Sequence, residues 1–243
     1  RTEMERLLLG SWTARETASG FFKRDWVNFV DTANIRATKR VRAWDISGTK
    51  PSEVNPDPDW TAGVLLSRDK DSVITVEDVV RIQDRPHVVK ELIFDTAKSD
   101  GPGITIAIPL DPGATAGAWC RQLQRELAEK GYTVKLVKPS TAKVQRFRPF
   151  ATIAEARFVQ IIRDAPWTKA YLDELEAFTG QRSRVHDDQV DATSDATYVL
   201  LQNFELPIMT LPNIQVSGQP LQSFHTSYGK NQGNFTLPTF NIK

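Results

Sequence analysis

The chain has 243 residues, 40% hydrophobic and 25% charged, which is within the range of a globular protein that can bury a core of its own. A formal net charge of +1 excludes a global field that would attract nucleic acid, so any basic surface must be local. The single cysteine, Cys120, excludes a disulfide framework and a thiolate metal cluster and favours a reducing compartment, and no apolar run is long enough to span a membrane.

The central part of the chain predicts alternating strands and helices. The first three predicted elements are strands, at residues 39–47, 60–69 and 72–82. The turn between the second and third strands is short and polar, which predicts that these two strands pair antiparallel. Helices and strands alternate over the next four elements: 85–101 (helix), 103–111 (strand), 115–131 (helix) and 132–139 (strand). A further strand at 156–164 and two helices at 168–180 and 184–201 complete the prediction. This order predicts an α/β fold, in which an antiparallel three-strand ribbon and parallel strands form a mixed sheet flanked by helices.

Both ends of the chain differ from this pattern. Residues 1–38 are interpreted as a lead-in arm, since the aromatics of residues 20–30 can dock on a core but have no obvious strand partner. Residues 39–205 form the predicted domain, and residues 206–243, rich in Asn, Gln, Ser and Pro, are expected to be weakly structured or draped on it. Because the chain begins with Arg1, we expect it to be a piece of a longer protein.

Two acidic residues lie on predicted strands. Asp45 shares a strand face with Val41 and Ala43, where an ionised carboxylate needs a partner unless it lies at the strand end and faces water. Asp111 ends the apolar run of residues 103–111, and ligand sites of open α/β sheets lie beyond the carboxyl ends of strands. The alternative for Asp111 is a turn opener before Pro112 and Gly113.

The last predicted helix carries four more carboxylates. Asp187, Asp191 and Asp195 share one helical face, and Asp188 borders it. Capping and the helix dipole explain acids at a helix start, and Asp195 can equally be solvated. Small residues between the acids allow the helix to approach the sheet closely, which would bring these carboxylates to Asp45 and Asp111.

Such a convergence of carboxylates requires cations. Oxygen ligands without cysteine, and with few histidines, favour Mg²⁺ or Mn²⁺ rather than zinc. Two such ions about 3.5–4 Å apart can clamp the attacking and leaving oxygens of a phosphoryl transfer. Asp59 and Asp191 are expected to contact the metal ligands without binding the metal themselves, and the alternative for Asp59 is a turn residue. His186, at the start of the helix, is expected to have a structural role.

A basic stretch without acidic residues spans residues 135–150. It follows a predicted strand and should emerge on the same side of the sheet as Asp111 if the two strands are parallel. We expect four of its side chains to bind a phosphate backbone: Lys138, Lys143, Arg146 and Arg148. The alternative is a solvated loop and helix face.

Four segments, in this order, resemble the C-terminal nuclease domain of the large terminase subunit of tailed bacteriophages. They are RAWDIS, IPLDPGATAG, KPSTAKVQRFRPFA and HDDQVDATSDA. The resemblance implies an RNase H-like fold and cleavage of concatemeric viral double-stranded DNA with two Mg²⁺ or Mn²⁺ ions. It assigns metal binding and catalysis to Asp45, Asp111 and Asp187, with Asp188 as a further ligand. The family's N-terminal ATPase domain is absent from this chain.

The resemblance also implies partners and a location. The partners are DNA, the phage portal protein and the small terminase subunit, without a membrane, and the location is the host cytoplasm during assembly rather than the mature virion. Two other hypotheses remain open at this point. One is another RNase H-like nuclease of the resolvase or transposase type, and the other is a non-catalytic DNA-binding or docking module of the packaging machine.

Overall fold

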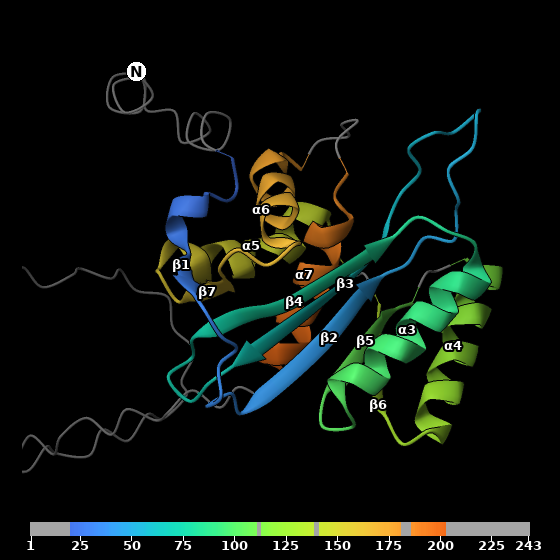
Figure 1. Ribbon diagram of the computed structural model, residues 1–243, viewed down its shortest axis with the longest axis horizontal. Helices are drawn as coiled ribbons and strands as arrows, with labels where there is room; N and C mark the ends of the chain where they lie inside the picture. Colours follow the sequence, from blue (N-terminus) through green and yellow to red (C-terminus); the bar gives the residue numbers. More distant parts are fainter. Residues whose placement is uncertain (1–19, 111–112, 139–140, 181–185, 203–243) are drawn as a thin grey trace, which may run out of the picture. The chain divides into compact units, whose positions relative to one another are not determined.

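The computed structural model describes residues 20–110, 113–138, 141–180 and 186–202. These residues form a mixed seven-stranded sheet with the order β1-β7-β4-β3-β2-β5-β6 (Figure 1). The strands are β1 (Asn28–Val30), β2 (Lys39–Asp45), β3 (Thr61–Arg68), β4 (Ile74–Ile82), β5 (Thr105–Pro109), β6 (Thr133–Val137) and β7 (Val159–Ile162). The predicted fold class, a mixed sheet flanked by helices, is confirmed.

The centre of the sheet is the predicted antiparallel ribbon. Strand β3 pairs antiparallel with both β2 and β4. The turn from β3 to β4 is closed by Asp69, whose carboxylate accepts hydrogen bonds from the backbone N–H groups of Asp71 and Val73. Strands β5 and β6 add to one side in parallel, and β7 and β1 add to the other side, also in parallel.

Helices cover both faces of the sheet (Figure 1). They are α3 (Pro86–Asp100), α4 (Ala114–Glu129), α5 (Lys143–Glu155), α6 (Thr168–Ala177) and α7 (Asp188–Leu201), and a short 3-10 helix, η1 (Arg24–Trp26), precedes β1. One core joins α3 and α4 to Trp44, Ile106 and Ile108 of the sheet. The other core joins α5, α6 and α7 to the opposite face, which includes Val41 and Ala43. Among the described residues, no helix has the length and hydropathy needed to cross a membrane.

The alternation of side chains along β2 decides where Asp45 points. Trp44 faces α3 and α4 and lies over Gly63 of β3, where an added Cβ would come within 2.6 Å of the indole ring. Successive strand residues point to opposite faces, so Asp45 shares the face of Ala43, which is the face covered by α7. Trp44 and Gly63 are therefore in contact on the sheet face opposite to the one on which the Asp45 carboxylate lies.

Two elements were not predicted from the sequence. Strand β1 pairs with β7, and Phe22, just before it, is fully buried against Phe147 and Phe150. The basic stretch forms helix α5, which buries those same two phenylalanines and contains Pro149. Part of the predicted lead-in arm thus contributes to the core and to the sheet.

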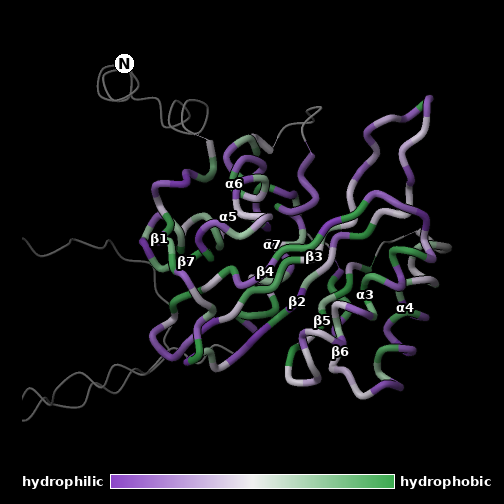
Figure 2. Tube along the Cα trace, in the orientation of Figure 1, coloured by the Kyte–Doolittle hydropathy of each residue, from purple (hydrophilic) through white to green (hydrophobic). Residues whose placement is uncertain are grey.

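Several strands end or begin on the same side of the sheet, at the carboxyl ends of its parallel strands. The carboxyl ends of β2, β5 and β6 lie together because these strands are parallel. Strand β3 starts at this edge because it is antiparallel to β2. The long connection between β2 and β3, residues 46–60, extends from the same edge and is mostly hydrophilic (Figure 2). Any site built here draws its residues from distant parts of the sequence.

Candidate metal centre

Asp45 is the last residue of β2 and is partly buried. Burial raises the pKa of its carboxyl group well above the usual value, and the negative charges of Asp191 and Asp188 raise it further. Its Oδ1 accepts a hydrogen bond from the backbone N–H of Ile46 at 3.1 Å. Burial is the larger of these two effects, and the charges of α7 add to it.

Helix α7 presents three buried acids on one side: Asp188, Asp191 and Asp195. Burial raises the pKa of Asp188 and of Asp195 to about 6 in each case. Asp188 Oδ2 accepts a hydrogen bond from the backbone N–H of Trp60, at the start of β3, at 3.1 Å. The spacing of i, i+3 and i+7 places all three on one face of α7, where Asp191 and Asp195 contact Arg146 of α5.

Asp187 lies at the N-cap position of α7, but its side chain makes no capping hydrogen bond. Both of its oxygens instead accept hydrogen bonds from Lys143 Nζ, at 2.8 and 2.7 Å. Asp187 therefore lies beside the acids of α7 and shares Lys143 with Asp191, which is 2.8 Å from the same Nζ.

Two cationic side chains of α5 lie against the acids of α7. Lys143 Nζ is 2.8 Å from Asp191, and Arg146 contacts Asp191 at 2.6 Å and Asp195 at 3.3 Å. Burial disfavours the charge of Lys143, but hydrogen bonds to Asp187 and Asp191 keep its pKa above the ordinary value. Part of the acidic charge is thus balanced by side chains that the sequence suggested for DNA binding.

A second group of candidate ligands adjoins Asp188. One ligand atom each from Asp59, His186 and Asp188 lie within 4.8 Å of one another. His186 also bridges two elements, because its Nε2 is 2.9 Å from Asp57 in the long connection and its Nδ1 is 3.3 Å from Asp188. These contacts join residues 46–60 to the start of α7.

Helix α7 is fixed at both ends by other elements. At its N-terminus, Glu174 of α6 accepts hydrogen bonds from the backbone N–H groups of Gln189 and Val190, at 2.6 and 3.3 Å. At its C-terminus, Lys39 Nζ donates to the carbonyl groups of Val199, Leu200 and Gln202. An acidic group at the N-terminus and a basic group at the C-terminus interact favourably with the helix dipole, and they bond backbone N–H and C=O groups that have no partner within the helix. These contacts fix the position of α7, and thus of its acids, relative to β2.

The remaining predicted residues lie as follows. Asp111 is outside the described residues, and Leu110 before it donates its backbone N–H to Val137 at the carboxyl edge of β6, at 2.7 Å. Lys138 is exposed directly after β6, and Arg148 is exposed on α5. Asp59, next to Trp60, adjoins the site through Asp188.

The acids of β2 and α7 are donors of the type that a hard divalent cation prefers, and among the described residues Asp59, His186 and Asp188 are the group whose ligand atoms lie within 4.8 Å of one another. Asp45, Asp188 and Asp191 supply carboxylate oxygens from a strand and a helix, and burial, together with the charges of Asp191 and Asp188, raises the pKa of Asp45. Mg²⁺ and Mn²⁺ prefer such oxygen ligands. The described residues therefore contain an acid cluster whose charge is only partly balanced by Lys143 and Arg146.

A family model described as the terminase RNaseH-like domain matches residues 42–198, which is more than half of the chain. The chain belongs to this family. The match to the terminase family begins within β2 and ends within α7, so it includes both elements that carry the acid cluster. The sequence matches no curated protein.

Solved terminase nucleases share the fold. The large terminase nuclease of the thermophilic phage G20c with bound magnesium is 15% identical, with a TM-score of 0.52, over 75% of this chain and 98% of that one. The human cytomegalovirus terminase nuclease domain, soaked with Mn and bound to an inhibitor, is 11% identical, with a TM-score of 0.54, over 74% and 95%. At these identities the likeness establishes an RNase H-like fold.

Sequence reasoning placed the acids on the correct helix but missed some of their neighbours. Asp195 is buried beside Arg146 rather than solvated. Glu174 was not selected, since nothing in its local pattern shows that it caps another helix. Helical spacing allows Asp188, Asp191 and Asp195 to share one face. Predicting this set rather than Asp187, Asp191 and Asp195 requires knowing that the helix begins at Asp188.

Proposed function

We propose that this chain is a divalent-metal-dependent endonuclease that cuts double-stranded DNA. The observation that carries the proposal is that Asp45, at the end of β2, lies on the sheet face covered by α7, the helix that carries the buried acids Asp188 and Asp191. Membership of the terminase RNaseH-like family supports the same reaction. The metals bound in the relatives, magnesium in the phage G20c nuclease and Mn in the cytomegalovirus domain, match the oxygen donors of this cluster.

Asp45, Asp188 and Asp191 are the described residues that would hold two Mg²⁺ or Mn²⁺ ions. Asp111 remains a further proposed ligand, because β5 ends at the same edge as β2. When bound, the ions would supply the positive charge that activates water and stabilises the leaving oxygen in phosphodiester hydrolysis. Asp187, whose oxygens accept hydrogen bonds from Lys143, also remains a proposed catalytic residue and metal ligand.

Lys143 and Arg146 would serve two states of the site. Without metal they neutralise the acids of α7 through the ion pairs described above. With metal present, the same cations would be available to contact phosphate oxygens of the DNA next to the acids. Lys138 and Arg148, exposed at the end of β6 and on α5, would extend the phosphate contacts. Backbone contacts carry no base information, so sequence preference would be weak.

In this role the chain would cut concatemeric viral DNA during genome packaging in the host cytoplasm. The portal protein and the small terminase subunit would be its packaging partners. Residues 39–205, joined by Phe22 and strand β1 from the predicted arm of residues 1–38, would form the nuclease domain, followed by the tail of residues 206–243.

The test is cleavage of supercoiled plasmid DNA by the purified chain. We expect nicked and linear products with Mn²⁺ or Mg²⁺, and none with EDTA. The Asp45→Asn variant should be inactive, whereas Asp173→Asn, which alters an exposed acid of α6, should cut normally. Cleavage that persists in EDTA, or in Asp45→Asn, would exclude the proposed mechanism.

A further inference from the structure

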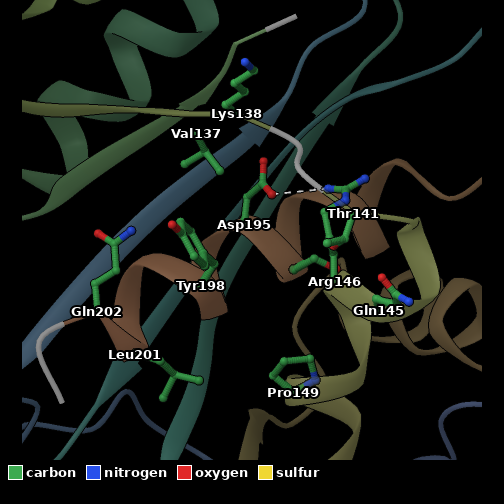
Figure 3. A pocket seen from close by; sticks show the side chains of 11 residues that line it. Val137, Lys138, Thr141, Gln145, Arg146, Pro149, Asp195, Tyr198, Leu201 and Gln202 are labelled. Carbon is green, nitrogen blue, oxygen red and sulfur yellow. Dashed lines mark hydrogen bonds and ion pairs between the residues drawn. The ribbon is translucent and has the colours of Figure 1, made fainter.

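A cleft of about 400 Å³ opens between the end of β6, helix α5 and the second half of α7 (Figure 3). Its apolar walls include Val137, Pro149 and Leu201. Asp195 and Arg146 close the end that adjoins the acid cluster, and their ion pair is drawn in Figure 3. The cleft is therefore next to the candidate metal centre, since Arg146 also contacts Asp191, but it is not lined by the proposed ligands.

Tyr198 gives this cleft an aromatic wall. Every residue of α7 from Asp188 to Leu200 is buried except Tyr198, which is 57% exposed. The helix is otherwise fitted against the sheet, so an aromatic side chain at its one open position has no part in that packing. Exposed aromatic rings next to nucleic-acid sites commonly stack on unpaired bases.

The polar lining suits the other parts of a nucleotide. Arg146 is paired with Asp195 and Asp191, and Lys138, exposed directly after β6, adds a positive charge to the lining for a phosphate group. Gln145 of α5 and Gln202 after α7 offer amide groups that can donate to and accept from a base edge. A cleft of this volume is large enough for one nucleotide.

The cleft also lies at a useful distance from the acids. Tyr198 follows Asp191 by seven residues, and a helix rises about 1.5 Å per residue, which separates them by about 10 Å along α7. DNA advances about 3.4 Å per nucleotide along each strand. About three nucleotide steps would connect a phosphate at the acids to a nucleotide in the cleft.

We propose that this cleft binds one unpaired nucleotide of the DNA substrate, with its base stacked on Tyr198 and its phosphate near Lys138. The inference rests on the proposed nuclease function and adds a substrate feature to it. The enzyme would favour DNA that is frayed or distorted about three nucleotides from the cut.

The test compares two duplexes of the same sequence, one fully paired and one with a single unpaired 2-aminopurine. Binding is measured with the full chain carrying Asp45→Asn and with Mg²⁺, so that the DNA stays intact. We expect about tenfold tighter binding of the unpaired duplex, with quenching of the 2-aminopurine fluorescence. Adding Tyr198→Phe should preserve both effects, and adding Tyr198→Ala should abolish them. The matched control is Phe158→Ala, which removes an exposed aromatic residue outside the cleft.

Equal binding of the two duplexes, or a preference that survives Tyr198→Ala, would overturn the inference. So would loss of the preference in Tyr198→Phe, because that variant keeps the ring. The plasmid assay separates this failure from failure of the proposed function. A chain that cuts plasmid DNA without preferring the unpaired nucleotide refutes only the cleft, and a chain that shows the preference but does not cut refutes only the nuclease.

Discussion

Individual residues show how the fold concentrates negative charge at one place. Strand alternation predicted that Asp45 shares a face with Val41 and Ala43, but it left open whether the carboxylate is paired or faces water, and its assignment to metal binding came from the family resemblance. The ion pairs of Lys143 and Arg146 could not be predicted, since they depend on how α5 lies against α7. A basic stretch indicates positive charge but not its partner, and here two of its side chains neutralise carboxylates.

Replacing Asp45 with asparagine should stabilise the metal-free protein. The ionised carboxylate is disfavoured by burial and by the charges of Asp191 and Asp188, and the neutral amide removes both penalties. We expect the free energy of unfolding at pH 8 in EDTA to rise, because the variant no longer has to bury an ionisable carboxyl group among other acids. Urea denaturation followed by circular dichroism provides the measurement.

The control for this variant is Asp173→Asn on α6. Ion pairs with Lys169 and Arg24 lower the pKa of Asp173, so its ionised form is favoured and the amide should bring no gain. A decrease in stability for Asp45→Asn in EDTA would show that the carboxylates of β2 and α7 do not repel each other as described.

At the level of elements, long periodic segments were predictable and short or composite ones were not. The ribbon of β2, β3 and β4 follows from its alternation and its turn. Strand β1 has only three residues, and its partner β7 lies about 130 residues later, so no local pattern could reveal the pairing. Helix α5 was missed because Pro149 and a series of basic residues are typical of loops.

Glu174 should determine how well α7 is held in place. Replacing it with alanine leaves the buried N–H groups of Gln189 and Val190 without their acceptor, so we expect a loss of about 2–3 kcal/mol of stability. Glutamine keeps one acceptor oxygen and should lose less than about 1 kcal/mol. Glu176→Ala, on the same helix, alters a partly exposed ion pair with Arg24 and should cost at most about 1 kcal/mol. Chemical denaturation of the three variants tests this order, and equal losses for Glu174→Ala and Glu176→Ala would contradict it.

The whole molecule should respond to pH through its raised acid pKa values. Asp188 and Asp195 have pKa values of about 6, and Glu174 has a value of about 7, compared with about 4 in an unfolded chain. Between pH 4 and pH 7 these three acids hold more protons in the folded chain than in the unfolded chain. The free energy of unfolding therefore falls as pH rises from about 4 to 7.

Without metal, we expect this fall to reach about 2 kcal/mol or more in EDTA. Adding Mn²⁺ should reduce it, since a cation bound to the ionised acids stabilises the folded state. Thermal melts across this pH range, with EDTA and with Mn²⁺, supply the comparison. Stability in EDTA that rises from pH 4 to 7 would have the wrong sign for this account.

The most direct test is a crystal of the chain soaked in Mn²⁺ and examined for anomalous density. The account predicts a peak within about 2–2.5 Å of carboxylate oxygens of Asp45 and of Asp188 or Asp191, with Lys143 displaced from Asp191. A well-ordered acid cluster without Mn²⁺ density, or with density only beside other residues, would contradict it.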